Sequence, residues 1–122
     1  MPPKYLKHLE DVLIAVERIE RFVADKTFAN YSVDDLLRSA VERQFLVIAE
    51  AMTRVKRDDP TVLESITGVR PLIAFRNIVV HAYDLVDDLK IWNIIDQHLP
   101  ILRGEVEALL EPWSDWPPGE EE

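Results

Sequence analysis

A spacing of about 3.6 residues between apolar side chains is the feature of this sequence that most restricts its fold. Between Lys4 and about Asp25, apolar residues recur at that spacing, and charged residues fill most of the positions between them. The apolar set is Leu6, Leu9, Val12, Leu13, Val16, Ile19, Phe22 and Val23. Such a stripe predicts one long amphipathic helix, which must bury its apolar face against other elements.

A second stripe with the same spacing follows a short break at Thr27 to Tyr31. It predicts a helix from Val33 to about Arg57. Ser32 precedes this helix and is followed three residues later by an acidic residue, Asp35. We therefore expect Ser32 to act as its N-terminal cap, in a weak form of the capping box.

Two further helices are predicted in the second half of the chain. Pro71 suits a first helical turn, so the third helix should run from about Arg70 to His81 or Tyr83. The fourth should run from Leu89 to about Leu110, after an Asp87-Asp88 cap. Pro100 lies inside it and has no backbone N–H, so we expect a kink or break at that point.

Four long helices with short connections and no alternating pattern predict an all-α fold, an up-down four-helix bundle. A short extra helical turn is expected between Thr61 and Thr67, after the turn signal Asp58-Asp59-Pro60. Residues 1–110 would form this domain, and residues 111–122 an acidic tail rich in tryptophan and proline. The tail could dock in a groove of a partner or of the chain itself, or remain frayed.

Charge and composition restrict the classes of function. The net charge is −9, divided into +1 over residues 1–57 and −10 over residues 58–122, so nucleic acid would need a local basic patch, most simply from the first half. The chain has no cysteine, which excludes disulfides and thiolate metal sites and suits a reducing cytoplasm. No apolar run approaches the roughly 20 residues that span a bilayer, so we expect no membrane association.

The predicted third helix carries a concentration of polar groups in an apolar region. An arginine, an amide, an imidazole, a phenol and a carboxylate fall within nine residues, interrupted by Ile78-Val79-Val80. These groups are Arg76, Asn77, His81, Tyr83 and Asp84. Polar groups in such a setting need partners or a function. One interpretation is purely structural: an Arg–Asp pair with a hydrogen-bonded His and Tyr would tie helices together.

Helical geometry limits how these groups can meet. Successive helical residues are about 100° apart, which places Arg76 and Tyr83 about 20° from each other and Asn77 about 40° from His81. Arg76 and His81, however, are about 140° apart. They can converge only if the helix ends or distorts near His81, or if two copies of the helix meet across a two-fold dimer.

An arginine and a histidine would suffice for one particular reaction, the attack of an RNA 2′-hydroxyl on the neighbouring phosphate. His81 would transfer protons near neutral pH, and Arg76 would stabilise the charged phosphorane. No cofactor or metal is required, and one histidine with one acid at this spacing does not match a zinc site. His8 and His98 lack such neighbours and are expected on helix surfaces.

The segment Arg76-Asn77-Ile78-Val79-Val80-His81-Ala82-Tyr83 matches the Arg, four residues, His, any residue, Tyr motif of the HEPN superfamily. In particular it resembles the HepT toxin family. The likeness extends to Glu42 through Ala51 and to Ile91-Trp92 through Pro100, and covers roughly residues 5–110.

This resemblance implies a HEPN-like helical domain that forms a homodimer, with the motifs of both chains lining a shared cleft. It implies a metal-independent endoribonuclease that is the toxin of a type II toxin–antitoxin pair in the cytoplasm. Arg76 and His81 would be catalytic, with Asn77 and Tyr83 supporting the site. An MntA-like minimal nucleotidyltransferase would be the cognate antitoxin and would transfer AMP to Tyr83. The alternative is a non-catalytic helical adaptor, the substrate-binding subunit of a minimal nucleotidyltransferase.

Overall fold

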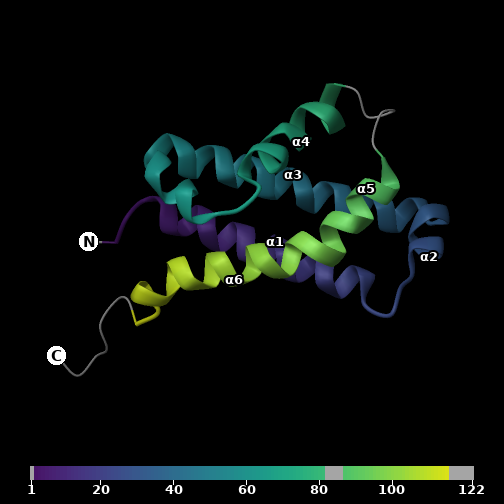
Figure 1. Cartoon of the computed structure of the whole chain (residues 1–122), viewed down its shortest axis with the longest axis horizontal. Coiled ribbons are helices and arrows are strands. Elements are labelled where there is room, and N and C mark those ends of the chain that lie inside the picture. Colours follow the sequence, from purple (N-terminus) through teal and green to yellow (C-terminus); the bar gives the residue numbers. More distant parts are fainter. Residues whose placement is uncertain (1, 82–86, 116–122) are drawn as a thin grey trace.

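The structure of the chain is a computed structural model that describes residues 2–81 and 87–115, with only the backbone course for residues 76–81. All regular elements in these residues are helical, which confirms the predicted all-α fold. The long helices form a bundle (Figure 1). They are α1 (Tyr5–Val23), α3 (Asp35–Asp58), α4 (Val69–His81) and α6 (Leu99–Leu110). Between and after them lie α2 (Phe28–Val33), the 3₁₀ helix η1 (Pro60–Ser65), α5 (Asp88–Asn93), the π-helix η3 (Ile94–His98) and the 3₁₀ helix η4 (Glu111–Trp113).

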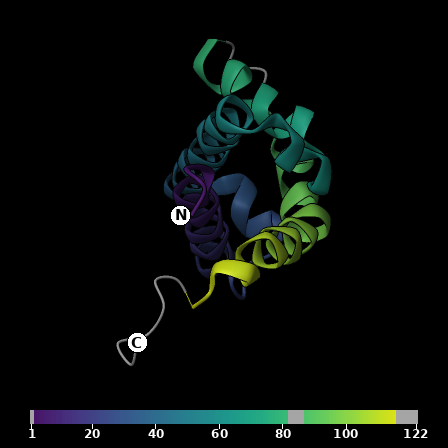
Figure 2. The same cartoon turned by 90° about the vertical axis from the view of Figure 1, so that its left-hand side faces the viewer.

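The core lies where α1 and α3 run side by side, with α6 along another side of α1 (Figures 1 and 2). The apolar stripes predicted from the sequence supply it, because their fully buried members face one another. Examples are Leu9, Val12, Val16 and Ile19 of α1, and Val41, Ile48, Met52 and Val55 of α3. Burial of one such aliphatic side chain contributes about 1.5–3 kcal/mol. These contacts fix the scaffold on which α4 and α5 rest.

The connection between α1 and α3 differs from the prediction. Thr27 and Asn30 form a reciprocal capping box that starts a short helix, α2, where the sequence predicted only a break. The expectation that Ser32 caps the second long helix is wrong. Asp34 caps it instead, since its side chain accepts a hydrogen bond from the Leu37 N–H at 3.0 Å. Ser32 Oγ donates to the carbonyl of Ala29.

The predicted fourth helix is broken, as the proline in it suggested. α5 ends at Asn93, a π-helical turn follows, and Pro100 lies in the first turn of α6. The Leu99 N–H donates to the carbonyl of Ile94, five residues earlier, which is the π pattern. A proline at position 100 cannot continue an α-helical hydrogen-bond ladder, so the disturbance precedes it. The extra turn expected near Thr61 is confirmed as η1.

None of the helices in the described residues is long and apolar enough to cross a membrane.

Candidate active-site helix

The candidate catalytic residues lie in the last two turns of α4. Arg76, Asn77 and His81 all belong to this helix, and His81 is its final residue. Tyr83 and Asp84 lie outside the described residues. The backbone of α4 is continuous α-helix from Val69 to His81. Positions 76 and 81 therefore keep the separation of about 140° around the axis, and one straight helix presents them in different directions.

The first half of α4 is held firmly on α3. Phe75 is 8% exposed and its ring lies 5.3 Å from that of Phe45, with the ring planes tilted by 46°. Such a tilted aromatic pair adds about 0.5–1.5 kcal/mol beyond the area it buries. Leu72 and Ile73 also pack against the core. Before the helix, Gly68 has a φ of 74°, a left-handed conformation that favours glycine and turns the chain into α4.

Beyond this anchored half, α4 rises obliquely away from α3 (Figure 1). Both views place the end that carries His81 far from α1 and α6 (Figures 1 and 2). The last turns of α4 therefore lie at an edge of the described bundle (Figures 1 and 2).

The chain re-enters the bundle at the start of α5, where two acidic residues fix it. Asp87 caps α5 by accepting hydrogen bonds from the N–H groups of Leu89 and Lys90, at 3.0 and 3.2 Å. Asp88 lies 3.8 Å from the Arg38 guanidinium on α3. The cap agrees with the sequence prediction. The contact with Arg38 was not predicted, because it joins residues fifty positions apart.

A group of ionisable residues surrounds this junction. Burial, and next the charge of Asp88, raise the pKa of the Glu42 carboxyl, while Arg38 opposes them. Burial raises the pKa of Tyr31 as well, followed by the charges of Glu42 and Asp88. The Tyr31 hydroxyl is buried and has no hydrogen-bond partner among the residues the structure describes. Sequence patterns did not single out Tyr31 or Arg38, indicated Asp88 only as part of a helix cap, and included Glu42 only within the resemblance.

The two other histidines differ in their surroundings. His8, expected on a helix surface, is instead largely buried, with its Nε2 atom 3.6 Å from the Asp58 carboxylate. That contact joins the start of α1 to the end of α3, and His8 belongs to the scaffold. His98 is exposed at the end of η3, as predicted. No group of three His, Asp or Glu side chains in the described part of the chain is placed to hold a metal ion.

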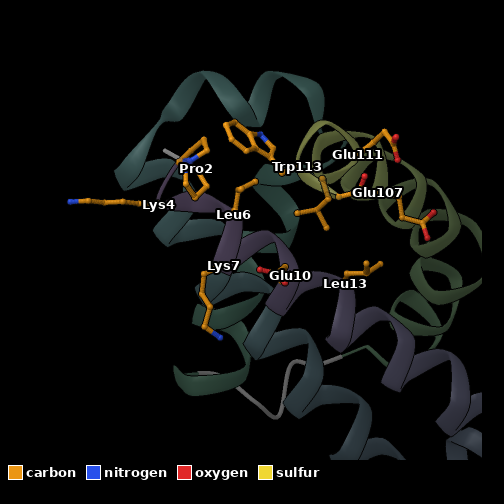
Figure 3. Close-up of a pocket in the computed structure, with 12 residues that line it drawn as sticks. Pro2, Lys4, Leu6, Lys7, Glu10, Leu13, Glu107, Glu111 and Trp113 are labelled. Carbon is orange, nitrogen blue, oxygen red and sulfur yellow. The ribbon is translucent and has the colours of Figure 1, made fainter. Parts of the chain in front are cut away.

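A large open groove lies at the opposite end of the molecule from the motif. It has a volume of about 730 Å³ and runs between the start of α1 and the end of α6 (Figure 3). Leu6 and Leu13 lie on its α1 side, and Trp113 of η4 closes one end. Glu10, Glu107 and Glu111 also line it and outnumber Lys4 and Lys7, so the groove carries no excess of positive charge to attract RNA. The predicted acidic tail begins here, and residues 116–122 lie outside the described residues.

Comparison with known proteins gives a consistent result. A family model described as "Ribonuclease HepT-like" matches residues 12–109. The chain is 29% identical to "Probable ribonuclease HepT" of Thermococcus cleftensis over 109 residues, which is 89% of this chain and 98% of that protein. It is 25% identical to "Putative RNase MJ1380" of Methanocaldococcus jannaschii over 101 residues, which is 83% of this chain and 92% of that protein. No solved structure matches the chain significantly.

Proposed function

This chain belongs to the HepT-like ribonuclease family, and we propose that it cleaves RNA without a metal ion, using Arg76 and His81. The observation that carries the proposal is the placement of the motif. Both residues belong to one continuous helix, and its last two turns rise away from the bundle (Figure 1). The names of its relatives, which refer to ribonucleases, support the same reaction.

The proposed reaction is a transesterification within the RNA chain. The ribose 2′-oxygen attacks the adjacent phosphorus, the bond from phosphorus to the 5′-oxygen breaks, and a cyclic phosphate remains. His81 takes the proton of the 2′-hydroxyl as a general base, and the departing 5′-oxygen takes a proton from a histidine or from water. Arg76 donates hydrogen bonds to the phosphorane oxygens, where its fixed charge opposes the added negative charge. Asn77 and Tyr83 support the site.

We further propose that two copies of the chain share one cleft. The separation of about 140° between positions 76 and 81 prevents both side chains of one straight helix from facing the same phosphate. Two copies related by a two-fold axis remove this difficulty, because Arg76 of one chain can then face His81 of the other. The chain has a net charge of −9, so it repels RNA except where cations gather. A second copy doubles the arginines beside the substrate.

In the cell, the protein would act in the cytoplasm as the toxin of a toxin–antitoxin pair, with a minimal nucleotidyltransferase as its antitoxin. Transfer of AMP from ATP to the Tyr83 hydroxyl oxygen, with release of pyrophosphate, would add a bulky anion two residues from His81. That group would block the cleft and compete with the substrate phosphate for Arg76. Mass spectrometry after incubation with the nucleotidyltransferase and ATP should find an AMP adduct, and Tyr83→Phe should remove it.

The central experiment compares growth and RNA integrity after expression of wild type, Arg76→Ala and His81→Ala. Each substitution should lower cleavage of RNA by purified protein about 100-fold or more and relieve toxicity. Arg70→Ala is the matched control, since Arg70 is exposed in the first turn of α4 and should be dispensable. Intact RNA with every variant, including wild type, would refute the ribonuclease and leave the adaptor function, which co-purification with the nucleotidyltransferase would reveal.

A further inference from the structure

A second, smaller cavity lies between the start of α4 and the helices that it packs against. It has a volume of about 200 Å³ and is enclosed by α3, the start of α4 and the succession of α5, η3 and α6. Its inner surface is apolar: Phe45, Phe75, Leu99 and Leu102 line it and are at most 8% exposed. A closed core packs such surfaces against each other without a space of this size. An apolar space of this size therefore suggests room for a ligand.

The entrance of the cavity has a different character from its interior. Lys90 and His98 line it, and both are exposed. Neither side chain has a hydrogen-bond or ion-pair partner among the side chains that the structure describes. Among the residues that the structure describes, none that lines the cavity is acidic, although residues 58–122 carry fourteen Asp and Glu. The entrance thus combines two potential cations in the more acidic half of the chain.

The remaining polar residue of the lining is already satisfied. The Thr67 N–H donates to Glu105 Oε1 at 2.9 Å, and the Thr67 hydroxyl donates to Glu105 Oε2 at 2.7 Å. Thr67 therefore keeps no donor for a ligand, and Glu105 has both carboxylate oxygens engaged by Thr67. Among the described side chains of the lining, Lys90 and His98 keep donors for a ligand.

The π-helical turn accounts for the arrangement of the cavity wall. In a regular α-helix, residues five positions apart point about 140° away from each other. In η3 the Leu99 N–H bonds to the Ile94 carbonyl, which brings these two residues above one another on the cavity side. His98 is thereby kept at the entrance while Leu99 fills the interior. Single π turns inside helices occur frequently at functional sites.

We propose that this cavity binds a small organic anion with an apolar body of about one ring, such as an arylalkyl carboxylate. An apolar cavity of about 150 Å³ accommodates benzene, so about 200 Å³ admits one ring with a short chain. Drug-sized ligands need about 300–1,000 Å³ and are excluded. The apolar body would lie against Phe75 and Leu102, and the carboxylate would face Lys90 and His98. The site is separate from RNA cleavage and does not depend on it.

Binding can be tested with a matched pair of probes, 4-phenylbutyrate and the neutral 4-phenyl-1-butanol, in calorimetric titrations of the full chain. Both should bind saturably at one site, and the carboxylate should bind more tightly. The double variant Lys90→Gln/His98→Gln should weaken the carboxylate about two- to fivefold for each lost cation and leave the alcohol unchanged. Lys26→Gln, at an exposed position in the turn after α1, is the charge control and should change neither.

Filling the cavity tests its location. Leu72 is half-buried and lines the cavity, so Leu72→Trp should abolish binding of both probes. If circular dichroism shows that this variant does not fold, Ile94→Phe serves the same purpose. Saturable binding that survives the filling substitution would overturn the site. Equal affinities for the acid and the alcohol would overturn the assignment to an anion, as would an unaltered carboxylate affinity in the double variant. If neither probe binds saturably, both the site and its preference for an anion are overturned.

Discussion

Glu42 occupies an environment that opposes its charge. It is half-buried on α3, and burial and then Asp88 raise its pKa, with Arg38 only partly compensating. A carboxyl with a raised pKa in the folded state holds its proton more strongly there than in the unfolded chain. Between the unfolded pKa, about 4.3, and the higher folded pKa, the folded protein therefore binds more protons, and its stability falls as the pH rises. Above that interval the ionised Glu42 destabilises the fold.

Because ionised Glu42 destabilises the fold, the substitution Glu42→Gln should raise the stability at neutral pH. The variant should be more stable than wild type at pH 7.5, by less than about 1 kcal/mol because the residue is only partly buried. At pH 3.5 Glu42 is itself protonated, and the difference should largely disappear. Urea unfolding at both pH values measures it, with Glu64→Gln at an exposed position as control. A Glu42→Gln variant less stable than wild type at pH 7.5 would show that attraction to Arg38 outweighs the cost of burial.

Individual residues differ in how far the sequence could indicate their role. Arg76 and His81 attract notice because their chemistry and spacing are unusual within an apolar segment. Tyr31 and Arg38 give no such signal. Their importance arises only when the corner between α2 and α3 brings them to Asp88, a contact between distant parts of the chain. Local patterns cannot reveal a contact that depends on how helices fold back on one another.

At the level of helices, the start of α3 offers a direct comparison of sequence and structure. The sequence favoured Ser32 as the cap, whereas the structure assigns this role to Asp34, through its hydrogen bond to the Leu37 N–H. Asp34→Ala should therefore destabilise the protein by about 1 kcal/mol. Ser32→Ala, which loses only a bond to the Ala29 carbonyl, should cost less than about 0.5 kcal/mol. Thermal or urea unfolding of the two variants measures these losses of stability. A larger loss for Ser32→Ala than for Asp34→Ala would show that Ser32 is the cap.

The elements predicted well are those with long apolar stripes, such as α1 and α3, because many residues contribute to one periodic signal. The six residues of α2 are too few to establish a period, so the sequence showed only an interruption there. Pro100 predicted that the fourth helix would break, but the π turn at Ile94–His98 lies ahead of it. The ring of Pro100 disturbs the turn before it, but a proline alone does not indicate that this disturbance takes the form of a π turn.

At the scale of the whole molecule, a packed body of helices carries the end of α4 that contains the motif arginine and histidine. α1, α3 and α6 form the stable body, reinforced by Arg103 of α6, whose guanidinium contacts Glu17 and Glu20 of α1. The last turns of α4 rise from this body (Figures 1 and 2). In a single copy, positions 76 and 81 are about 140° apart around one helix. If each active site is built from two copies, activity should depend on dimer formation, and a dilute monomer with full activity would contradict the proposed cleft.

Mixing two inactive variants tests the shared cleft most directly. In a dimer of an Arg76→Ala chain with a His81→Ala chain, one site receives both substitutions and the other receives neither. Half of the dimers formed from an equal mixture are of this mixed kind, so co-refolding the two variants should restore about a quarter of wild-type ribonuclease activity. Each variant refolded alone should remain inactive, as should a mixture of Arg76→Ala with the double variant Arg76→Ala/His81→Ala. If the first mixture stays inactive although light scattering shows dimers, each chain must contain its own complete site, and α4 must then distort near His81 to bring the two residues together.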